Sequence, residues 1–90
     1  MRALIVEDDP VLSEQLAAAM QDAGFVTDQA ASGDQGEYLG STETYDVAVL
    51  DLGLPGMPGI DVLTAWRDQG IAMPVLAAIL SVAASRETAW

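Results

Sequence analysis

The chain has 90 residues and a formal net charge of −11, because fourteen Asp and Glu residues face only three Lys and Arg residues. This charge disfavours nucleic-acid partners, whose phosphates require basic side chains, and anionic membrane surfaces. Cysteine and histidine are absent, which excludes disulfides, thiolate chemistry and imidazole bases or ligands. The sequence contains neither a signal peptide nor an apolar run near the roughly 20 residues of a membrane span. We therefore expect one soluble, cytoplasmic domain.

An acidic triplet directly follows the first predicted strand, which is the apolar run 3–6. Within the triplet, Asp9 stands before Pro10, and this pair predicts the N-cap and the first residue of a helix. We therefore assign Asp9 to the helix cap. The other two carboxylates, Glu7 and Asp8, remain at the end of the strand.

The helix predicted after Pro10 is amphipathic and ends at Gly24, because glycine readily adopts the left-handed conformation of a helix C-cap. Its apolar residues repeat at helical spacing and are expected to face the core. This apolar stripe consists of Leu12, Leu16, Met20 and Ala23. The polar residues expected on the other faces are Ser13, Glu14, Gln21 and Asp22.

Residues 25–30 predict a half-exposed strand at the outside of the sheet. Ser32 and Gln35 then have the spacing of a capping box and predict the start of a second helix. This helix is expected to extend to about Leu39, with Gly36 reducing its propensity.

The central predicted strand is the apolar run 47–50, which ends at Asp51 and precedes a loop rich in glycine and proline. A third helix is expected from near Gly59 to Gly70, and residues 73–77 are expected to form a fourth strand. The side chains of this helix that are predicted to point inward are Ile60, Leu63 and Trp66. Strands that alternate with helices predict an α/β fold with a parallel sheet.

Asp51 is the first candidate for a functional residue, because open α/β sheets bind ligands at the carboxyl ends of their strands. Taken alone, it is better explained as a strand-end Asp that turns the chain by bonding nearby backbone amides. If the first and central strands are neighbours, however, Glu7 and Asp8 converge with it. Clustered carboxylates repel one another, so the cluster requires raised pKa values or a hard cation such as Mg²⁺.

Two stretches together resemble the receiver domain of two-component response regulators: Leu-Ile-Val-Glu-Asp-Asp at 4–9 and Val-Leu-Asp-Leu-Gly-Leu-Pro-Gly-Met-Pro-Gly at 49–59. The resemblance covers about residues 2–77. It implies a doubly wound, flavodoxin-like parallel sheet in the strand order 2-1-3-4, with the fifth strand and helix of the family missing here.

The resemblance also implies a function for the acidic cluster. Asp51 is expected to accept phosphate as an acyl phosphate from a sensor histidine kinase or a phosphotransfer protein. Mg²⁺ is the expected cofactor, and its expected ligands are Glu7 (through a bound water), Asp8, Asp51 and the backbone carbonyl of Gly53. The segment itself is expected to bind neither membrane nor nucleic acid, although a downstream output domain in an intact family member binds DNA.

Two residues of the family pattern are missing. The hydroxyl residue expected at the end of the fourth strand falls on Ile79, with Ser81 two positions later, and the expected lysine is absent because the chain contains no lysine. Arg86 does not replace a compact ammonium group. We therefore expect residues 1–78 to form a receiver-like core. Residues 79–90 are expected to form an atypical tail of the same domain, an Ala-rich helix or an overlong strand, as in a truncated or frame-altered receiver.

Three functional interpretations remain open. The leading one is a phosphoacceptor signalling module that is not a turnover enzyme. The second is a receiver remnant that cannot switch and acts only as a metal-binding or protein-interaction module, which the missing Lys and Thr favour. The third is a Mg²⁺-dependent phosphatase with an Asp nucleophile, but such an enzyme needs a second carboxylate two residues later, where Gly53 stands.

The predicted fourth strand, extended to residues 73–78, would form an apolar edge of the sheet if no fifth strand covers it. We therefore expect a homo-oligomer. The residues expected to pack between copies are Ile79, Leu80, Val82 and Trp90. The alternative is a small monomer in which the tail covers its own edge.

Overall fold

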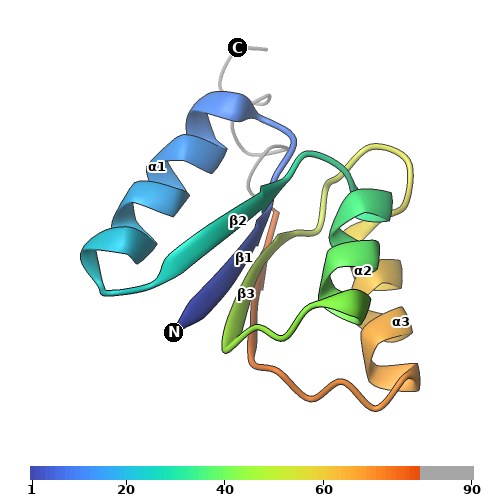
Figure 1. The fold of residues 1–90 in the computed structure, drawn as a ribbon. Coiled ribbons are helices and arrows are strands. Elements are labelled where there is room, and N and C mark those ends of the chain that lie inside the picture. Colours follow the sequence, from blue (N-terminus) through green and yellow to red (C-terminus); the bar gives the residue numbers. More distant parts are fainter. Residues whose placement is uncertain (80–90) are drawn as a thin grey trace, which may run out of the picture.

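The structure is a computed structural model, and it describes residues 1–79. Its four parallel strands form one sheet in the order β2-β1-β3-β4 (Figure 1), which confirms the predicted doubly wound fold. The strands are β1 (Arg2–Val6), β2 (Val26–Ala30), β3 (Val47–Asp51) and β4 (Val75–Ala78). The helices are α1 (Pro10–Asp22), α2 (Gly33–Thr42) and α3 (Gly59–Asp68). None of these three helices is long and apolar enough to cross a membrane.

The helices cover both faces of the sheet, with α1 on one face and α2 and α3 on the other (Figure 1). Because successive side chains of a strand point to opposite faces, β1 and β3 contribute to two cores. On the α1 face, Ile5 and Val49 pack with Ala17. On the other face, the buried cluster includes Leu4, Leu50, Val62 and Trp66. The central strands are therefore buried on both sides, as the apolar runs predicted.

The start of α1 agrees with the prediction, because the Asp9 carboxylate accepts hydrogen bonds from two backbone N–H groups of the first turn, at 2.9 and 3.3 Å. Two predictions for this helix are wrong. Ser13 is buried, and it tolerates burial because its hydroxyl accepts a hydrogen bond from the Gln29 side chain at 2.8 Å. Ala23 is exposed, since it is the C-cap residue and lies just beyond the packed face.

The second helix is longer than predicted, because α2 continues past Leu39 to Thr42. Its predicted start is correct, since the Ser32 hydroxyl accepts a hydrogen bond from the Gln35 backbone N–H at 3.2 Å. Glycines face its neighbours, so the helix backbone packs closely. The largest buried side chain, Trp66, lies against Gly40, where an added Cβ atom would stand 2.4 Å from the ring.

The third helix begins at Gly59 as predicted, but one of its inward positions is wrong. Ile60 is 56% exposed, whereas Val62 and Trp66, one turn apart, are fully buried. The reason is local: Gly59 packs against the end of β3, where an added Cβ atom would stand 2.4 Å from the Asp51 carbonyl oxygen. The following residue is rotated by about 100° around the helix axis and therefore points to solvent.

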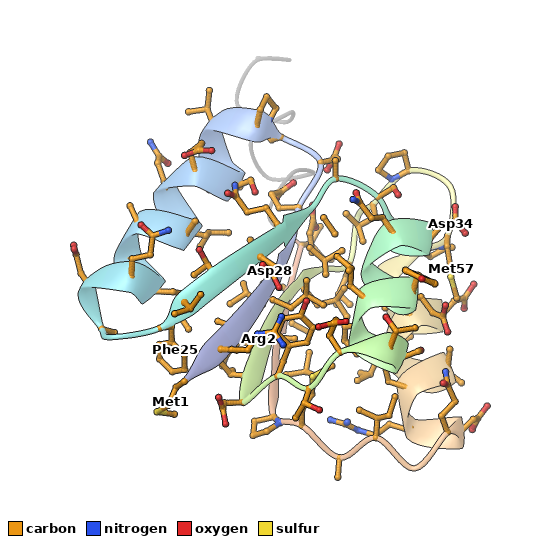
Figure 2. The ribbon with its side chains drawn as sticks, viewed as in Figure 1. Met1, Arg2, Phe25, Asp28, Asp34 and Met57 are labelled. Atoms are coloured by element: carbon orange, nitrogen blue, oxygen red, sulfur yellow. The ribbon has the colours of Figure 1, made fainter. Side chains whose placement is uncertain are left out.

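At the amino end of the sheet, Arg2 connects three acidic residues, of which Asp28 is labelled with it in Figure 2. Its guanidinium group donates to Asp28 at 2.8 Å and to Glu43 at 3.3 Å, and its backbone N–H donates to Asp46 at 2.6 Å. The guanidinium also lies 4.8 Å from the centre of the Tyr45 ring, and the Tyr45 hydroxyl donates to Asp28 at 2.8 Å. The acidic residues at this end therefore have partners within the chain.

Candidate metal and phosphoacceptor site

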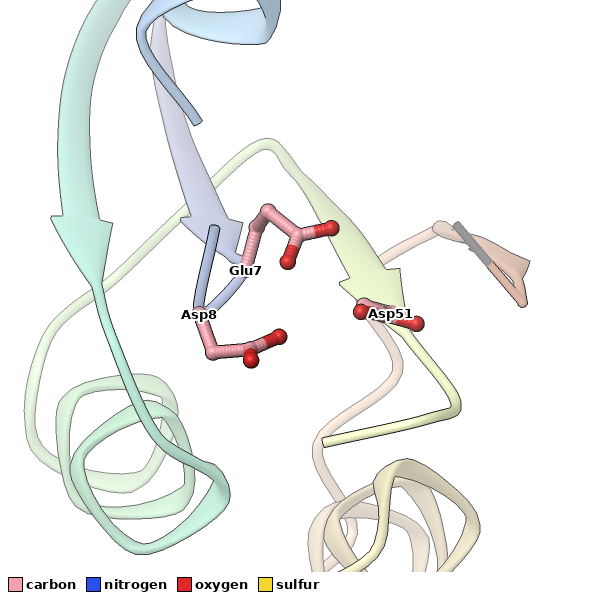
Figure 3. Close-up of side chains that lie close together, drawn as sticks. All are labelled: Glu7, Asp8 and Asp51. Atoms are coloured by element: carbon pink, nitrogen blue, oxygen red, sulfur yellow. The ribbon is translucent and has the colours of Figure 1, made fainter. Parts of the chain in front are cut away.

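Three carboxylates meet at the opposite, carboxyl end of the sheet: Glu7, Asp8 and Asp51 (Figure 3). Glu7 and Asp8 follow β1, and Asp51 ends β3, the parallel neighbour of β1. One carboxylate oxygen from each residue lies within 4.8 Å of the others. The strand order therefore brings together the carboxylates that the sequence singled out. Asp9 caps α1, as predicted, and is outside this cluster.

The cluster is largely shielded from solvent, since Glu7 is 2% exposed and Asp51 is fully buried. Burial raises the pKa of Glu7 from its ordinary 4.5 to about 7, and the neighbouring Asp8 and Asp51 act in the same direction. The backbone N–H of Asp9, which donates to Glu7 Oε2 at 2.9 Å, has the opposite effect. The site thus disfavours the charged form of Glu7.

Two oxygens of this cluster, Glu7 Oε1 and Asp8 Oδ1, are buried without a hydrogen-bond partner among the described residues. Such atoms are costly unless a ligand satisfies them. An all-oxygen set of carboxylates suits a hard divalent cation such as Mg²⁺. The residues present therefore fit the cation that the sequence predicted.

Neither arginine within residues 1–79 contacts Glu7 or Asp8. Arg2 is bound at the other end of the sheet, and Arg67 donates to the backbone carbonyls of Ile71 and Met73, at 2.7 and 3.0 Å. Arg86 and Ser81, which were considered as site residues, lie outside the described part of the chain.

The phosphoacceptor candidate, Asp51, is oriented by the loop that follows it. The Gly53 backbone N–H donates to Asp51 Oδ1 at 2.8 Å. The role of the Gly53 carbonyl as a metal ligand remains a prediction. On the other side, β4 pairs Ala78 with Asp51, so Ile79 is the residue directly after the strand partner of Asp51.

A cavity of about 200 Å³ adjoins the cluster between α1 and the connection from β2 to α2. Its lining includes Glu7 and Asp8, together with the polar side chains of Ser13, Gln29 and Gln35. Sequence reasoning missed this cavity, because its walls come from two separate stretches of the chain, residues 7–14 and 29–35. Two of the three carboxylates of the cluster thus border this cavity.

The sequence profile described as "Response regulator receiver domain" matches residues 3–89. The chain belongs to this family. The match confirms the resemblance seen in the two acidic stretches of the sequence, and it extends beyond residue 77, where that resemblance was expected to stop.

Curated relatives of this receiver domain are transcriptional regulators. The chain is 43% identical over 76 residues to "Probable transcriptional regulatory protein SilR" from Salmonella typhimurium, and the match covers 84% of this chain and 33% of that protein. It is 36% identical over 76 residues to "Transcriptional regulatory protein PhoP" from Escherichia coli (strain K12), with 84% and 34% covered. The chain thus spans about a third of the length of these two relatives.

Solved structures of receiver domains have the same fold. The Francisella response regulator 1452 receiver domain is 30% identical with a TM-score of 0.80, and the match covers 84% of this chain and 63% of that one. The response regulator protein TrrA from Thermotoga maritima, solved in complex with Mg(2+)-BeF, is 28% identical with a TM-score of 0.78, covering 82% and 64%.

Proposed function

We propose that this receiver domain is a phosphoacceptor module of a two-component system, with Asp51 as the phosphorylated residue. Mg²⁺ would be held by Glu7, Asp8, Asp51 and the backbone carbonyl of Gly53. The observation that carries the proposal is the convergence of three carboxylates with two buried, unsatisfied oxygens at the carboxyl end of the sheet. The TrrA structure, which is a complex with Mg(2+)-BeF, supports the same type of site.

In this proposal the Asp51 carboxylate attacks the phosphorus of a phosphohistidine on a sensor kinase or phosphotransfer protein. The new O–P bond forms an acyl phosphate as the P–N bond breaks, and the histidine nitrogen takes up a proton. The Gly53 N–H orients the attacking carboxylate. Bound Mg²⁺ supplies positive charge that neutralises the phosphoryl oxygens. Because the domain accepts one phosphoryl group per signalling cycle, it acts in this proposal as a signalling module and not as a turnover enzyme; its proposed location is the cytoplasm.

A second candidate function is a receiver that binds metal or protein but does not switch. Ile79 favours it, because this side chain stands where the family has a hydroxyl group and cannot donate a hydrogen bond. Each missing donor of this kind typically costs about 3 kcal/mol of transition-state stabilisation. We therefore expect phosphorylation of the parent protein to be slow.

The deciding experiment is intact mass spectrometry after incubation with a small acyl-phosphate donor, with and without Mg²⁺. The proposal predicts slow gain of one phosphate that requires Mg²⁺ and is lost in Asp51→Asn. If Mg²⁺ binds but no phosphate is ever gained, the second candidate function is correct. If Mg²⁺ does not bind at all, the site assignment itself is wrong.

A matched pair of variants tests the role of position 79. Ile79→Thr introduces the missing hydroxyl, and Ile79→Val introduces a side chain of nearly the same shape without it. We expect Ile79→Thr to raise the initial rate of phosphorylation by about tenfold or more, and Ile79→Val to leave it unchanged. Equal rates in the two variants would show that no hydroxyl is needed at this position.

We also propose that the chain self-associates through β4. This strand contains no charged residue, and Leu76 is 64% exposed and Ile79 55% exposed. The other edge strand, β2, carries Asp28, a charged side chain of the kind that blunts sheet edges. A second copy offers the same uncharged strand, so two copies of β4 can pair antiparallel about a two-fold axis.

Self-association has a distinctive salt dependence. Each copy carries a net charge of −11, so added salt should strengthen the dimer by screening repulsion, whereas salt would weaken binding to a basic partner. Light scattering should show a dimer that Leu76→Lys disrupts and Val26→Lys, on the exposed β2 edge, does not. A monomeric mass at every concentration and salt level would instead favour a tail that covers its own edge.

A further inference from the structure

The loop of residues 52–58 connects the phosphoacceptor candidate to α3, and its two ends are held together. Gly59 packs so closely on the end of β3 that an added Cβ atom would stand 2.4 Å from the Asp51 carbonyl oxygen and 2.7 Å from the Leu52 Cα atom. Within the loop, Leu54 is only 7% exposed and belongs to the core that contains Val62. The base and middle of the loop are therefore anchored to β3 and α3.

The far side of this loop rests on another element, the first residue of α2. An added Cβ atom on Gly33 would stand 1.9 Å from the Met57 carbonyl oxygen and 2.9 Å from its carbonyl carbon. Gly33 is buried, and its φ is not positive. Glycine is therefore required at this position by the close backbone contact and not by a left-handed conformation. Figure 2 shows Asp34, the next residue of α2, beside Met57.

Of the two sides of this contact, the loop is the one that can move. The α2 helix is held by the Ser32 cap and by the Trp66 indole N–H, which donates to the Glu37 carbonyl at 3.3 Å. In the loop, Pro55, Gly56 and Pro58 are exposed. A side chain on residue 33 would therefore displace the loop more than the helix.

We propose that Gly33 is a positioning residue for the phosphoacceptor site. Its contact with Met57 sets the path of the loop, and the loop carries Gly53, whose N–H orients Asp51. The part of this inference that concerns Mg²⁺ rests on the proposed function, because the proposed function assigns the Gly53 carbonyl to the metal. The second helix, which contributes no carboxylate to the cluster, thus helps to build the site.

The test compares the same substitution at two ends of one helix. Gly33→Ala presses on the Met57 carbonyl, and Gly40→Ala presses on the Trp66 ring, where the added Cβ atom would stand 2.4 Å from the nearest ring atom. Both variants should lower the melting temperature. Only Gly33→Ala should weaken Mg²⁺ binding, by about tenfold or more, as for other groups that support metal ligands indirectly. In the metal-free protein, only Gly33→Ala should speed hydrogen exchange at the Gly53 amide.

A further variant, Gly56→Ala, acts on the loop itself. Gly56 has φ +72, which alanine disfavours, and its added Cβ atom would meet only Asp34 at an ordinary 3.4 Å. It should weaken Mg²⁺ binding as Gly33→Ala does, and it is the variant to use if Gly33→Ala does not fold. Parent-like Mg²⁺ affinity and Gly53 exchange in either folded variant would overturn the inference without affecting the proposed function. A parent protein that does not bind Mg²⁺ would reject the proposed function, and Gly53 exchange would then decide the inference alone.

Discussion

The two ends of the sheet both collect acidic residues, but they stabilise them in different ways. At the amino end, Asp28, Glu43 and Asp46 surround Arg2, and the ion pairs there are about half exposed to solvent. At the carboxyl end, Glu7 and Asp51 are buried, and no described arginine contacts the Glu7 carboxylate. The amino end therefore has a cationic partner among the described residues, whereas the carboxyl end holds two buried oxygens, Glu7 Oε1 and Asp8 Oδ1, that have no hydrogen-bond partner among them.

The pKa values show the same contrast. The Tyr45 hydroxyl and the Arg2 guanidinium lower the pKa of Asp28 below its ordinary value, whereas burial raises the pKa of Glu7 to about 7. A high density of acidic residues is therefore a weak indication of a site. Burial of those residues together with a raised pKa, as for Glu7, is the stronger indication.

The largest expected effect is stabilisation by Mg²⁺, which should act at the carboxyl end only. A ligand that binds the folded state alone adds about 2.7 kcal/mol at a concentration of 100 Kd. Thermal melts of the parent with Mg²⁺ and with a chelator should differ by several degrees, and this difference should nearly vanish in Asp51→Asn. An unchanged melting temperature in the parent would remove the distinction between the two ends.

The next effect is the gain in metal-free stability when one charge is removed from the buried cluster. Asp51→Asn keeps an oxygen that can accept from the Gly53 N–H, and it relieves repulsion with Glu7, so we expect a gain of about 1 to 2 kcal/mol at pH 8, roughly one pKa unit of interaction. Urea unfolding measures it. The control is Asp46→Asn at the amino end, where a carboxylate bound to Arg2 is lost and no gain is expected. Equal gains would contradict the comparison.

A change of the free energy of unfolding with pH, on the order of 1 kcal/mol, is also expected from the raised pKa of Glu7. Because the pKa of Glu7 is raised from 4.5 to about 7 on folding, its favourable contribution is complete below pH 4.5 and is lost as pH rises through 7. Asp28, whose pKa is lowered, contributes in the opposite sense, above its ordinary value of 3.8. Urea unfolding of metal-free protein at pH 5 and pH 8 should therefore show a decline that Glu7→Gln abolishes.

The smallest effect should come from Arg2→Gln, because exposed ion pairs contribute little to stability. We expect a slight decrease in melting temperature and an unchanged response to Mg²⁺, since the substitution is at the far end of the sheet. A weaker Mg²⁺ response in this variant would mean that the two ends are coupled.

The predictable part of the site follows from chain order. Apolar runs that end in carboxylates predict parallel strands with acidic carboxyl ends, and Glu7, Asp8 and Asp51 met as expected. The pair Asp9 and Pro10 was likewise sufficient to assign Asp9 to the helix cap. These inferences need only local signals and the rule that parallel strands end at the same edge.

Two of the errors, at Ser13 and Ile60, depended on contacts between different elements of the fold, whereas the error at Ala23 arose at the end of its own helix. Ser13 is buried because Gln29, on β2, bonds to its hydroxyl. Ile60 faces solvent because Gly59 packs on the end of β3. In the contact between Gly33 and Met57, Met57 contributes its backbone carbonyl and Gly33 contributes no side chain. Because no side chain takes part, no pattern of residue types indicates this contact.

The close contact between Gly40 and Trp66 means that tryptophan fluorescence can report on the packing of α2 against α3. Trp66 is fully buried, and its indole N–H bonds to the Glu37 carbonyl of α2. Its fluorescence emission should therefore be blue-shifted in the folded protein and should move to the red when α2 separates from α3. The sequence contains two tryptophans, so Trp90→Phe would leave Trp66 as the single tryptophan, whose fluorescence reports on one helix interface.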